Sequence, residues 1–180
     1  MTKQFGTDGV RGEANVKLTP DLAFAIGRAL TILLQRENQA VGKEERPVIL
    51  VGKDTRLSGD MLEGALAAGV CAQGGLLMSL GVIPTPAVSA LVREEKADAG
   101  VVISASHNPF YDNGIKIFGA DGRKFADEKE AAIEAMITAS SYPPLAQKER
   151  IGKVVPYPHG GEVYIDRLKK FFPLSLSGLK

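Results

Sequence analysis

The chain has 180 residues, of which 44% are hydrophobic and 24% are charged, so intrinsic disorder and a coiled coil are both disfavoured. Its 22 basic and 21 acidic side chains leave a formal charge of +1, which argues against nucleic acid or an anionic membrane as a partner. The lone cysteine, Cys71, excludes an internal disulfide and a thiolate zinc cluster. Since no apolar run is long enough to span a membrane, we expect a cytoplasmic protein.

Helix and strand signals alternate along the first two thirds of the chain. Thr19 and Pro20 predict a helix start, because Thr caps backbone N–H groups and Pro suits the first turn. The apolar face of that helix comprises Leu22, Ile26, Leu30 and Leu33. A surface connection is expected at 35–46. We expect strands at 47–51, 76–80, 100–103 and 114–118. Helices are expected at 58–75 and 85–96, and Thr85 and Pro86 begin the second of these.

The last third of the chain is less regular. Asp127 and Glu130 have the spacing of a capping box, which predicts a helix to about residue 138. Residues 140–158 contain four prolines and are expected to follow an irregular surface path. Residues 161–172 predict one more helix, whose inward residues are Val163, Ile165 and Leu168. The alternation of helices with short strands predicts an α/β layered domain with a largely parallel sheet.

The segment most suggestive of chemistry follows the predicted strand at 100–103. It contains Ser104, Ser106, His107 and Asn108, and Lys116 comes soon after. In parallel α/β sheets ligands bind beyond the carboxyl ends of strands, and these side chains suit the holding and transfer of an anion. Strand alternation points Lys116 away from the face of its two isoleucine neighbours. The alternative is a capped turn in which the serines bond to backbone and the lysine is solvated.

Two other polar clusters are weaker candidates. The motif FGTDGVRG at 5–12 ends in Arg11, whose guanidinium suits phosphate oxygens, although an N-terminal turn with a solvated arginine is the alternative. The motif GKDTRLSG at 52–59 lies between a predicted strand and helix, a natural place for an anion. It lacks the residue order of a P-loop, and a βα loop with a surface interaction between Asp54 and Arg56 is the alternative.

Taken together, these motifs resemble the α-D-phosphohexomutase superfamily. In order they are FGTDGVRG (5–12), GKDTRLSG (52–59), the Thr85-Pro86 pair and ISASHNPFYDNGIKIFGADG (103–122). The resemblance implies a three-layer α/β/α domain with a short, mostly parallel mixed sheet. Full-length members have four domains around a cleft, so we expect residues 1–158 to form domain 1 and residues 159–180 a linker helix and the start of domain 2. Domains 2–4 would then be missing partners from the same polypeptide.

The resemblance also implies roles for individual residues. Ser106 matches the phosphoserine, which would pass its phosphoryl group to a hexosamine phosphate and regain one from a bisphosphorylated sugar. Lys116 and Arg11 match catalytic cations, and His107 matches a catalytic neighbour of the serine. Asn108 is expected, with Ser104, to bind substrate or phosphate. Mg²⁺ is the implied cofactor, and a phosphoryl oxygen on Ser106 would give it one ligand, the others lying outside this chain.

Substrate and reaction class have alternatives. The motifs most resemble superfamily members that interconvert glucosamine 6-phosphate and glucosamine 1-phosphate for cell-wall precursors, but members acting on glucose or mannose phosphates share the serine chemistry. A serine hydrolase using Ser106 and His107 is disfavoured, since adjacent residues project differently and no G-x-S-x-G elbow is present. A non-catalytic sugar-phosphate-binding module is a third possibility, and Ser104 is a second candidate position for the phosphoryl group.

Overall fold

The centre of the protein is a single six-stranded sheet. The computed structural model describes residue 6, residues 9–172 and residue 178. The strands are β1 (Val10–Glu13), β2 (Val48–Lys53), β3 (Leu76–Val82), β4 (Ala99–Ile103), β5 (Asp112–Gly119) and β6 (Lys153–Pro156). They lie in the order β1-β5-β4-β2-β3-β6. Strands β4, β2, β3 and β6 run parallel, whereas β5 is antiparallel to both of its neighbours.

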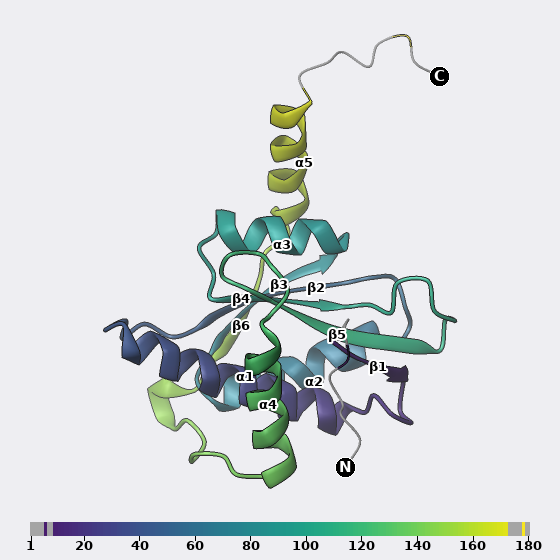
Figure 1. The fold of residues 1–180 in the computed structure, drawn as a ribbon. Coiled ribbons are helices and arrows are strands. Elements are labelled where there is room, and N and C mark those ends of the chain that lie inside the picture. The colour runs from purple at the N-terminus through teal and green to yellow at the C-terminus, as the bar shows by residue number, and fades with distance from the viewer. Residues whose placement is uncertain (1–5, 7–8, 173–177, 179–180) are drawn as a thin grey trace.

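Helices cover both faces of this sheet (Figure 1). On one face lie α1 (Pro20–Ala40), α2 (Gly59–Ala72) and α4 (Asp127–Ala139), and on the other lies α3 (Thr85–Glu94). Helix α5 (Gly160–Phe171) packs beside α3 at its start and projects away from the sheet. A short 3₁₀ turn, η1 (Lys148–Arg150), precedes β6. In the part of the chain that the structure describes, no helix is both long and apolar enough to cross a membrane. The expected three-layer α/β/α fold with a mixed, mostly parallel sheet is confirmed.

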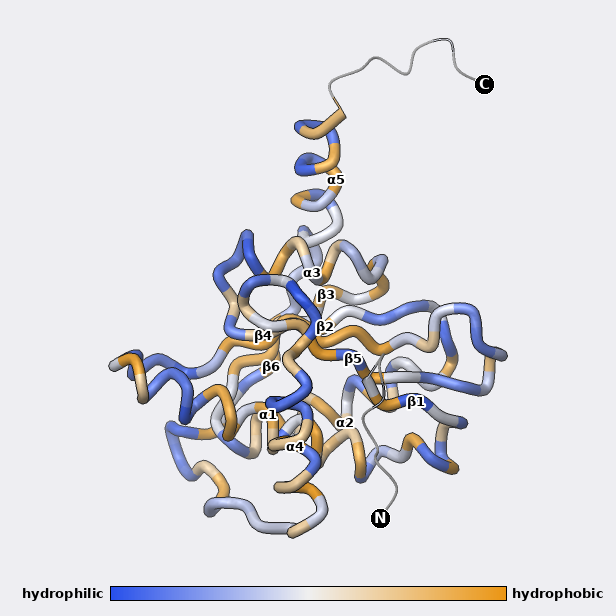
Figure 2. The backbone as a smooth tube through the Cα atoms, viewed as in Figure 1, coloured by the Kyte–Doolittle hydropathy of each residue, from blue (hydrophilic) through white to orange (hydrophobic). Residues whose placement is uncertain are grey.

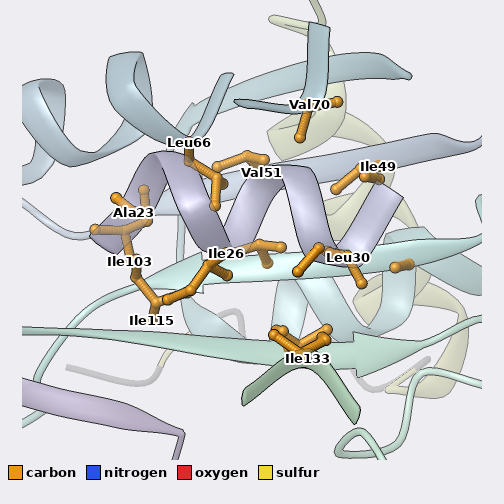
Figure 3. Packing of buried hydrophobic residues seen from close by; sticks show 14 of the residues in the cluster. Ala23, Ile26, Leu30, Ile49, Val51, Leu66, Val70, Ile103, Ile115 and Ile133 are labelled. Atoms are coloured by element: carbon orange, nitrogen blue, oxygen red, sulfur yellow. The ribbon is translucent and has the colours of Figure 1, made fainter. Parts of the chain in front are cut away.

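Two apolar clusters fill the spaces between the sheet and its helices, and the central strands β2 and β4 are among the most hydrophobic stretches of the chain (Figure 2). In the first cluster, Ile26 of α1 lies beside Ile115 of β5, and Ile133 of α4 belongs to the same cluster (Figure 3). In the second, Phe118 of β5 packs with residues of α3. Because β5 alternates between the clusters, Lys116 faces the α3 side and points away from its isoleucine neighbours, as alternation predicted.

Helices α1 and α2 touch through their backbones. A Cβ atom added to Gly69 of α2 would lie 2.1 Å from the carbonyl oxygen of Phe24, and one added to Gly27 of α1 would lie 2.3 Å from that of Leu66. Both distances are far below van der Waals contact, so only glycine allows the helices to approach this closely. This contact fixes α2, and with it the loop that precedes α2, against the rest of the domain.

Two segments differ from the sequence-based expectations. A surface connection was expected at 35–46, but this prediction is wrong for its first six residues, because α1 continues to Ala40. Two side chains in this last part of α1 make hydrogen bonds to the rest of the domain: Gln35 donates to the Gln73 carbonyl (2.7 Å) and Asn38 donates to Asp98 (3.2 Å). Strand β6 lies within the proline-rich segment expected to be irregular. It forms the sheet edge, where a proline such as Pro156 is tolerated.

Several predicted helix signals also need correction. Thr19 caps α1 as expected, accepting the Leu22 N–H (3.2 Å), but Thr85 is the first residue of α3 and Pro84 occupies the cap. The capping box at the start of α4 is absent, since Glu130 is buried and instead pairs with Lys124 (3.0 Å). In α5, Val163 packs inward as expected. Ile165 and Leu168 were also expected to face inward, but they are 52% and 39% exposed.

The glycine contact between α1 and α2 gives a matched test within one helix. Gly69→Ala is expected to lower the free energy of unfolding of this chain by about 1–3 kcal/mol, because the methyl group must push the helices apart. Gly64→Ala, where a Cβ meets nothing within 4 Å, should instead raise it by up to about 1 kcal/mol through better helix propensity. Denaturant unfolding of both variants measures the difference, and equal effects would contradict the packing described.

Candidate functional site

The predicted serine loop joins the end of β4 to the start of β5, and Ser106 lies at its exposed tip. The loop begins with a hydrogen bond from the Ser104 N–H to the Gly114 carbonyl oxygen (2.9 Å). Ser106 has a φ of +57°, a left-handed conformation that costs a non-glycine residue of order 1 kcal/mol and that clusters at functional sites. Its Oγ lies 3.3 Å from Nδ1 of His107, which is also exposed.

The Ser104 hydroxyl is engaged on both sides. It donates to Oδ2 of Asp54 (2.6 Å) and accepts the backbone N–H of Ser106 (3.1 Å). These bonds connect the loop after β4 to the loop after β2, and they orient the backbone on which Ser106 is carried. The expected contact of Ser104 with a ligand stays a prediction, and its two hydrogen bonds favour a role in the framework of the loop.

Arg56, which lies in the loop after β2, binds the serine loop through its guanidinium group. Its two Nη atoms donate to four backbone carbonyl oxygens, and its Nε donates to Oδ2 of Asp54 (3.0 Å). The four carbonyls are those of Ser106 (3.0 Å), Asn108 (2.8 Å), Pro109 (2.5 Å) and Asp112 (3.0 Å). Sequence reasoning treated Arg56 as an anion-binding or surface residue, because its carbonyl partners lie fifty or more residues away.

Asn108 and His107 occupy different environments within the loop. The Asn108 side chain is half-buried and donates to Oδ2 of Asp112 (2.9 Å), which closes the loop on itself. His107 is exposed beside the Ser106 hydroxyl. No carboxylate within hydrogen-bonding distance orients its ring among the described residues. The third group that a serine hydrolase needs to orient its base is therefore lacking in this part of the chain.

Arg11 and Lys116 lie on one face of neighbouring strands. Arg11 is half-buried in β1, so the polar loop expected at 5–12 is a strand from residue 10 onward, while residues 7 and 8 lie outside the described residues. Arg11 pairs with Gly114 of β5, which places it diagonally across from Lys116. A Cβ on Gly114 would lie 2.7 Å from the Ser104 carbonyl oxygen and 3.0 Å from Cγ of Arg11. Glycine there lets the arginine approach the loop closely.

The second predicted anion site, at 52–59, already has its cations engaged. Lys53 forms ion pairs with Asp60 (2.5 Å) and Glu63, and Arg56 is bound to the serine loop. Burial alone would lower the pKa of Lys53, but hydrogen bonds and charge from the two carboxylates outweigh it and raise that pKa. This cluster lines a groove of about 520 Å³ between α2, β3 and β6, and the serine loop is not part of its lining. The geometry does not favour an anion site here.

Asn113 is a fully buried residue that sequence reasoning missed. Its Nδ2 donates to the Ser58 hydroxyl (2.9 Å), and its Oδ1 accepts the Gly114 N–H (2.8 Å). The side chain thus connects the exit of the serine loop to the start of α2. The Asp-Asn-Gly triplet is typical of an exposed turn, so only the observed burial distinguishes this role.

The described residues do not form a complete magnesium site. Among them, no three His, Cys, Asp or Glu side chains lie close enough together to hold a metal ion. Near Ser106, the carboxylates of Asp54 and Asp112 already accept hydrogen bonds from Arg56, Ser104 and Asn108. Mg²⁺ needs an octahedral set of oxygen ligands, so this part of the chain supplies too few of them.

Comparison with protein families identifies the domain. Residues 2–143 match the family model described as phosphoglucomutase/phosphomannomutase, alpha/beta/alpha domain I. The chain belongs to this family. The expected resemblance to phosphohexomutases is therefore confirmed, and the matched segment includes the serine loop and the strands that carry both cations.

Curated relatives of this phosphohexomutase domain are longer enzymes. A phosphoglucosamine mutase from Streptococcus equi subsp. zooepidemicus is 52% identical over the whole chain, and one from Brevibacillus brevis is 49% identical. The chain spans 39% and 40% of the lengths of these two proteins.

Solved structures share the fold. A phosphoglucomutase/phosphomannomutase family protein from Burkholderia thailandensis superimposes with a TM-score of 0.75 at 26% identity, over 93% of this chain and 35% of that one. Parafusin from Paramecium, at 18% identity and a TM-score of 0.73, shares the fold over 95% of this chain and 35% of its own.

The buried amide of Asn113 gives a test of how the loop is anchored. Asn113→Ala removes both hydrogen bonds and is expected to lower the free energy of unfolding by about 1–3 kcal/mol. Ser58→Ala removes one of the two and should cost about 1 kcal/mol. Denaturant unfolding compares the stabilities, and hydrogen exchange at the Gly114 amide should accelerate only in the Asn113 variant. Unchanged exchange at Gly114 would contradict the assigned bond.

Proposed function

We propose that the full-length protein interconverts glucosamine 6-phosphate and glucosamine 1-phosphate, and that this chain carries the phosphoserine of that isomerase. The observation that supports the proposal most is the exposed Ser106 hydroxyl, held at the tip of a braced loop in a left-handed conformation. Relatives named phosphoglucosamine mutase, at 52% and 49% identity over the whole chain, support the choice of sugar.

The reaction consists of two phosphoryl transfers at Ser106. In the first, a sugar hydroxyl attacks the phosphorus of phospho-Ser106, the bond from phosphorus to the serine Oγ breaks, and a bisphosphorylated sugar forms. In the second, the reoriented sugar returns its other phosphoryl group to the same Oγ. We assign the proton transfers to Lys116: its amine accepts the proton of the attacking sugar hydroxyl and passes it to the departing serine Oγ, and in the second half it takes the serine proton and gives it to the departing sugar oxygen. Positioning and charge neutralisation are what such a transfer requires.

Charge compensation is assigned to Arg11 and to residues of the serine loop. A phosphoserine carries about −1.5 to −2 charges, which Arg11 offsets, joined by Lys116 once its amine has taken up the proton; both lie on the same face of the sheet. His107 contacts the serine oxygen, and Asn108 holds the loop that carries it. Mg²⁺ would neutralise further charge on the phosphoryl oxygens. Its carboxylate ligands would come from the part of the protein outside this chain, so the chain alone is expected to be inactive.

The domain boundary and location of the protein remain predictions. We propose residues 1–158 as the phosphoserine domain and residues 159–180 as the connection to the next one; residues 173–177, 179 and 180 lie outside the described residues. Helix α5 is joined to α3 by an ion pair between Arg167 and Glu94 (2.8 Å). A cytoplasmic location and a part in cell-wall precursor synthesis are proposed with the substrate.

A mutase acting on glucose or mannose phosphates is the second candidate, favoured by the description of the matched family. The chemistry at Ser106 is the same for all three sugars. Turnover of glucosamine, glucose and mannose phosphates by the full-length protein separates the candidates. We expect the highest kcat/KM with glucosamine phosphate, and a higher value with another sugar would reject the proposed specificity.

The phosphoserine assignment has a direct test in the full-length protein. Intact-mass analysis is expected to find one phosphoryl group, which peptide mapping places on Ser106 and not on Ser104. Ser106→Ala should lose that mass and lower kcat by about 10³-fold or more, because the group that carries the phosphoryl is gone. A Ser106→Ala variant that keeps its turnover would mean that another mechanism operates. Absence of both the phosphoryl group and mutase turnover in the unmodified protein would favour a phosphate-binding module, and labelling by a fluorophosphonate would favour a hydrolase.

A further inference from the structure

We infer that Arg56 is a positioning residue: its guanidinium holds the serine loop in the one conformation that presents Ser106 for phosphoryl transfer, and it does not bind the phosphoryl group. The inference rests on the proposed function. Neither the sequence motifs nor the proposed chemistry had given Arg56 this positioning role.

The count of hydrogen-bond donors supports this role. A guanidinium has five N–H donors. The structure uses each of them: one for Asp54 and four for the carbonyl oxygens of residues 106, 108, 109 and 112. The Arg56 side chain is only 11% exposed. A phosphate oxygen would therefore have to displace a bond to the loop in order to reach this arginine.

A second chain of bonds acts on the same backbone. Asp54 accepts from Arg56 and from the Ser104 hydroxyl, and that hydroxyl accepts the N–H of Ser106. The N–H and the C=O of Ser106 are thus both fixed, one through Ser104 and the other directly by Arg56. These two restraints on either side of its Cα explain how an unfavourable left-handed φ is maintained.

Charge alone does not account for the arrangement. The carboxylate of Asp54 lies 3.0 Å from Nε of Arg56 and compensates much of its positive charge. What the arginine adds is a planar fork that reaches several carbonyls at once, which an ammonium group with three donors does not reproduce. A substitution that keeps the charge but removes the fork therefore separates positioning from phosphate binding.

The test compares two Arg→Lys variants in the full-length protein. Arg56→Lys is expected to lower kcat by about 10²-fold with KM unchanged within about threefold, since a misplacement of about 1 Å costs a positioned reaction that much. The matched control is Arg46→Lys, because Arg46 also donates to loop carbonyls, those of Glu149 and Ile151, away from the serine loop. The control should keep kcat within about twofold of the original.

Two further measurements keep the outcome interpretable. Ser104→Ala removes only the link between Asp54 and the Ser106 N–H, and it is expected to lower kcat about tenfold while the protein stays folded. Hydrogen exchange in the peptide 104–112 should accelerate in Arg56→Lys and Ser104→Ala but not in Arg46→Lys. This readout needs no mutase activity, so it tests the positioning of the loop even if the proposed reaction is wrong.

The inference is overturned if Arg56→Lys keeps its kcat, or if loop exchange is unchanged. It is also overturned if KM for the sugar phosphate rises while kcat stays the same, because that pattern means substrate binding by Arg56. Failure of the proposed function appears elsewhere: the unmodified protein would lack mutase turnover, or Ser106→Ala would retain it.

Discussion

The organisation of this domain depends on one interaction, the binding of the Arg56 guanidinium to the carbonyls of the serine loop. The loop buries Ala105, but most of its residues from 106 to 111 are exposed. Without the guanidinium, several carbonyl groups would lose their partners, and Ser106 would relax from its left-handed conformation toward a commoner one. The arginine thus substitutes for the packing that a surface loop lacks.

The sheet brings the remaining groups to this loop. Strand β5 turns back antiparallel to β4, so the residues that follow the loop lie beside the strand that precedes it. Strand β1 then adds Arg11 to the outer side of β5, where Gly114 leaves room for the arginine. Both cations stand on one face because strand alternation is strict, and the apolar core on the opposite face keeps the strand in register.

Much of this could be predicted from sequence, for identifiable reasons. The α1 start and the direction of Lys116 follow from local rules of capping and alternation, and the motifs of the serine loop indicate the family. The partners of Arg56 and the burial of Asn113 could not be predicted, because they depend on residues about fifty positions away. Strand β6 was missed since its pairing with β3 overrides a proline-rich composition. Ile165 and Leu168 of α5 are exposed for a related reason: helical periodicity does not say which neighbour covers a face.

The central claim is that the oxygen of Ser106 carries the phosphoryl group that reaches the sugar. A single-turnover experiment tests it: full-length protein labelled at phospho-Ser106 is mixed rapidly with unlabelled glucosamine 6-phosphate. The account predicts that the label leaves the serine and appears on sugar at a rate at least equal to kcat. Label that stays on the protein through many turnovers would contradict the account.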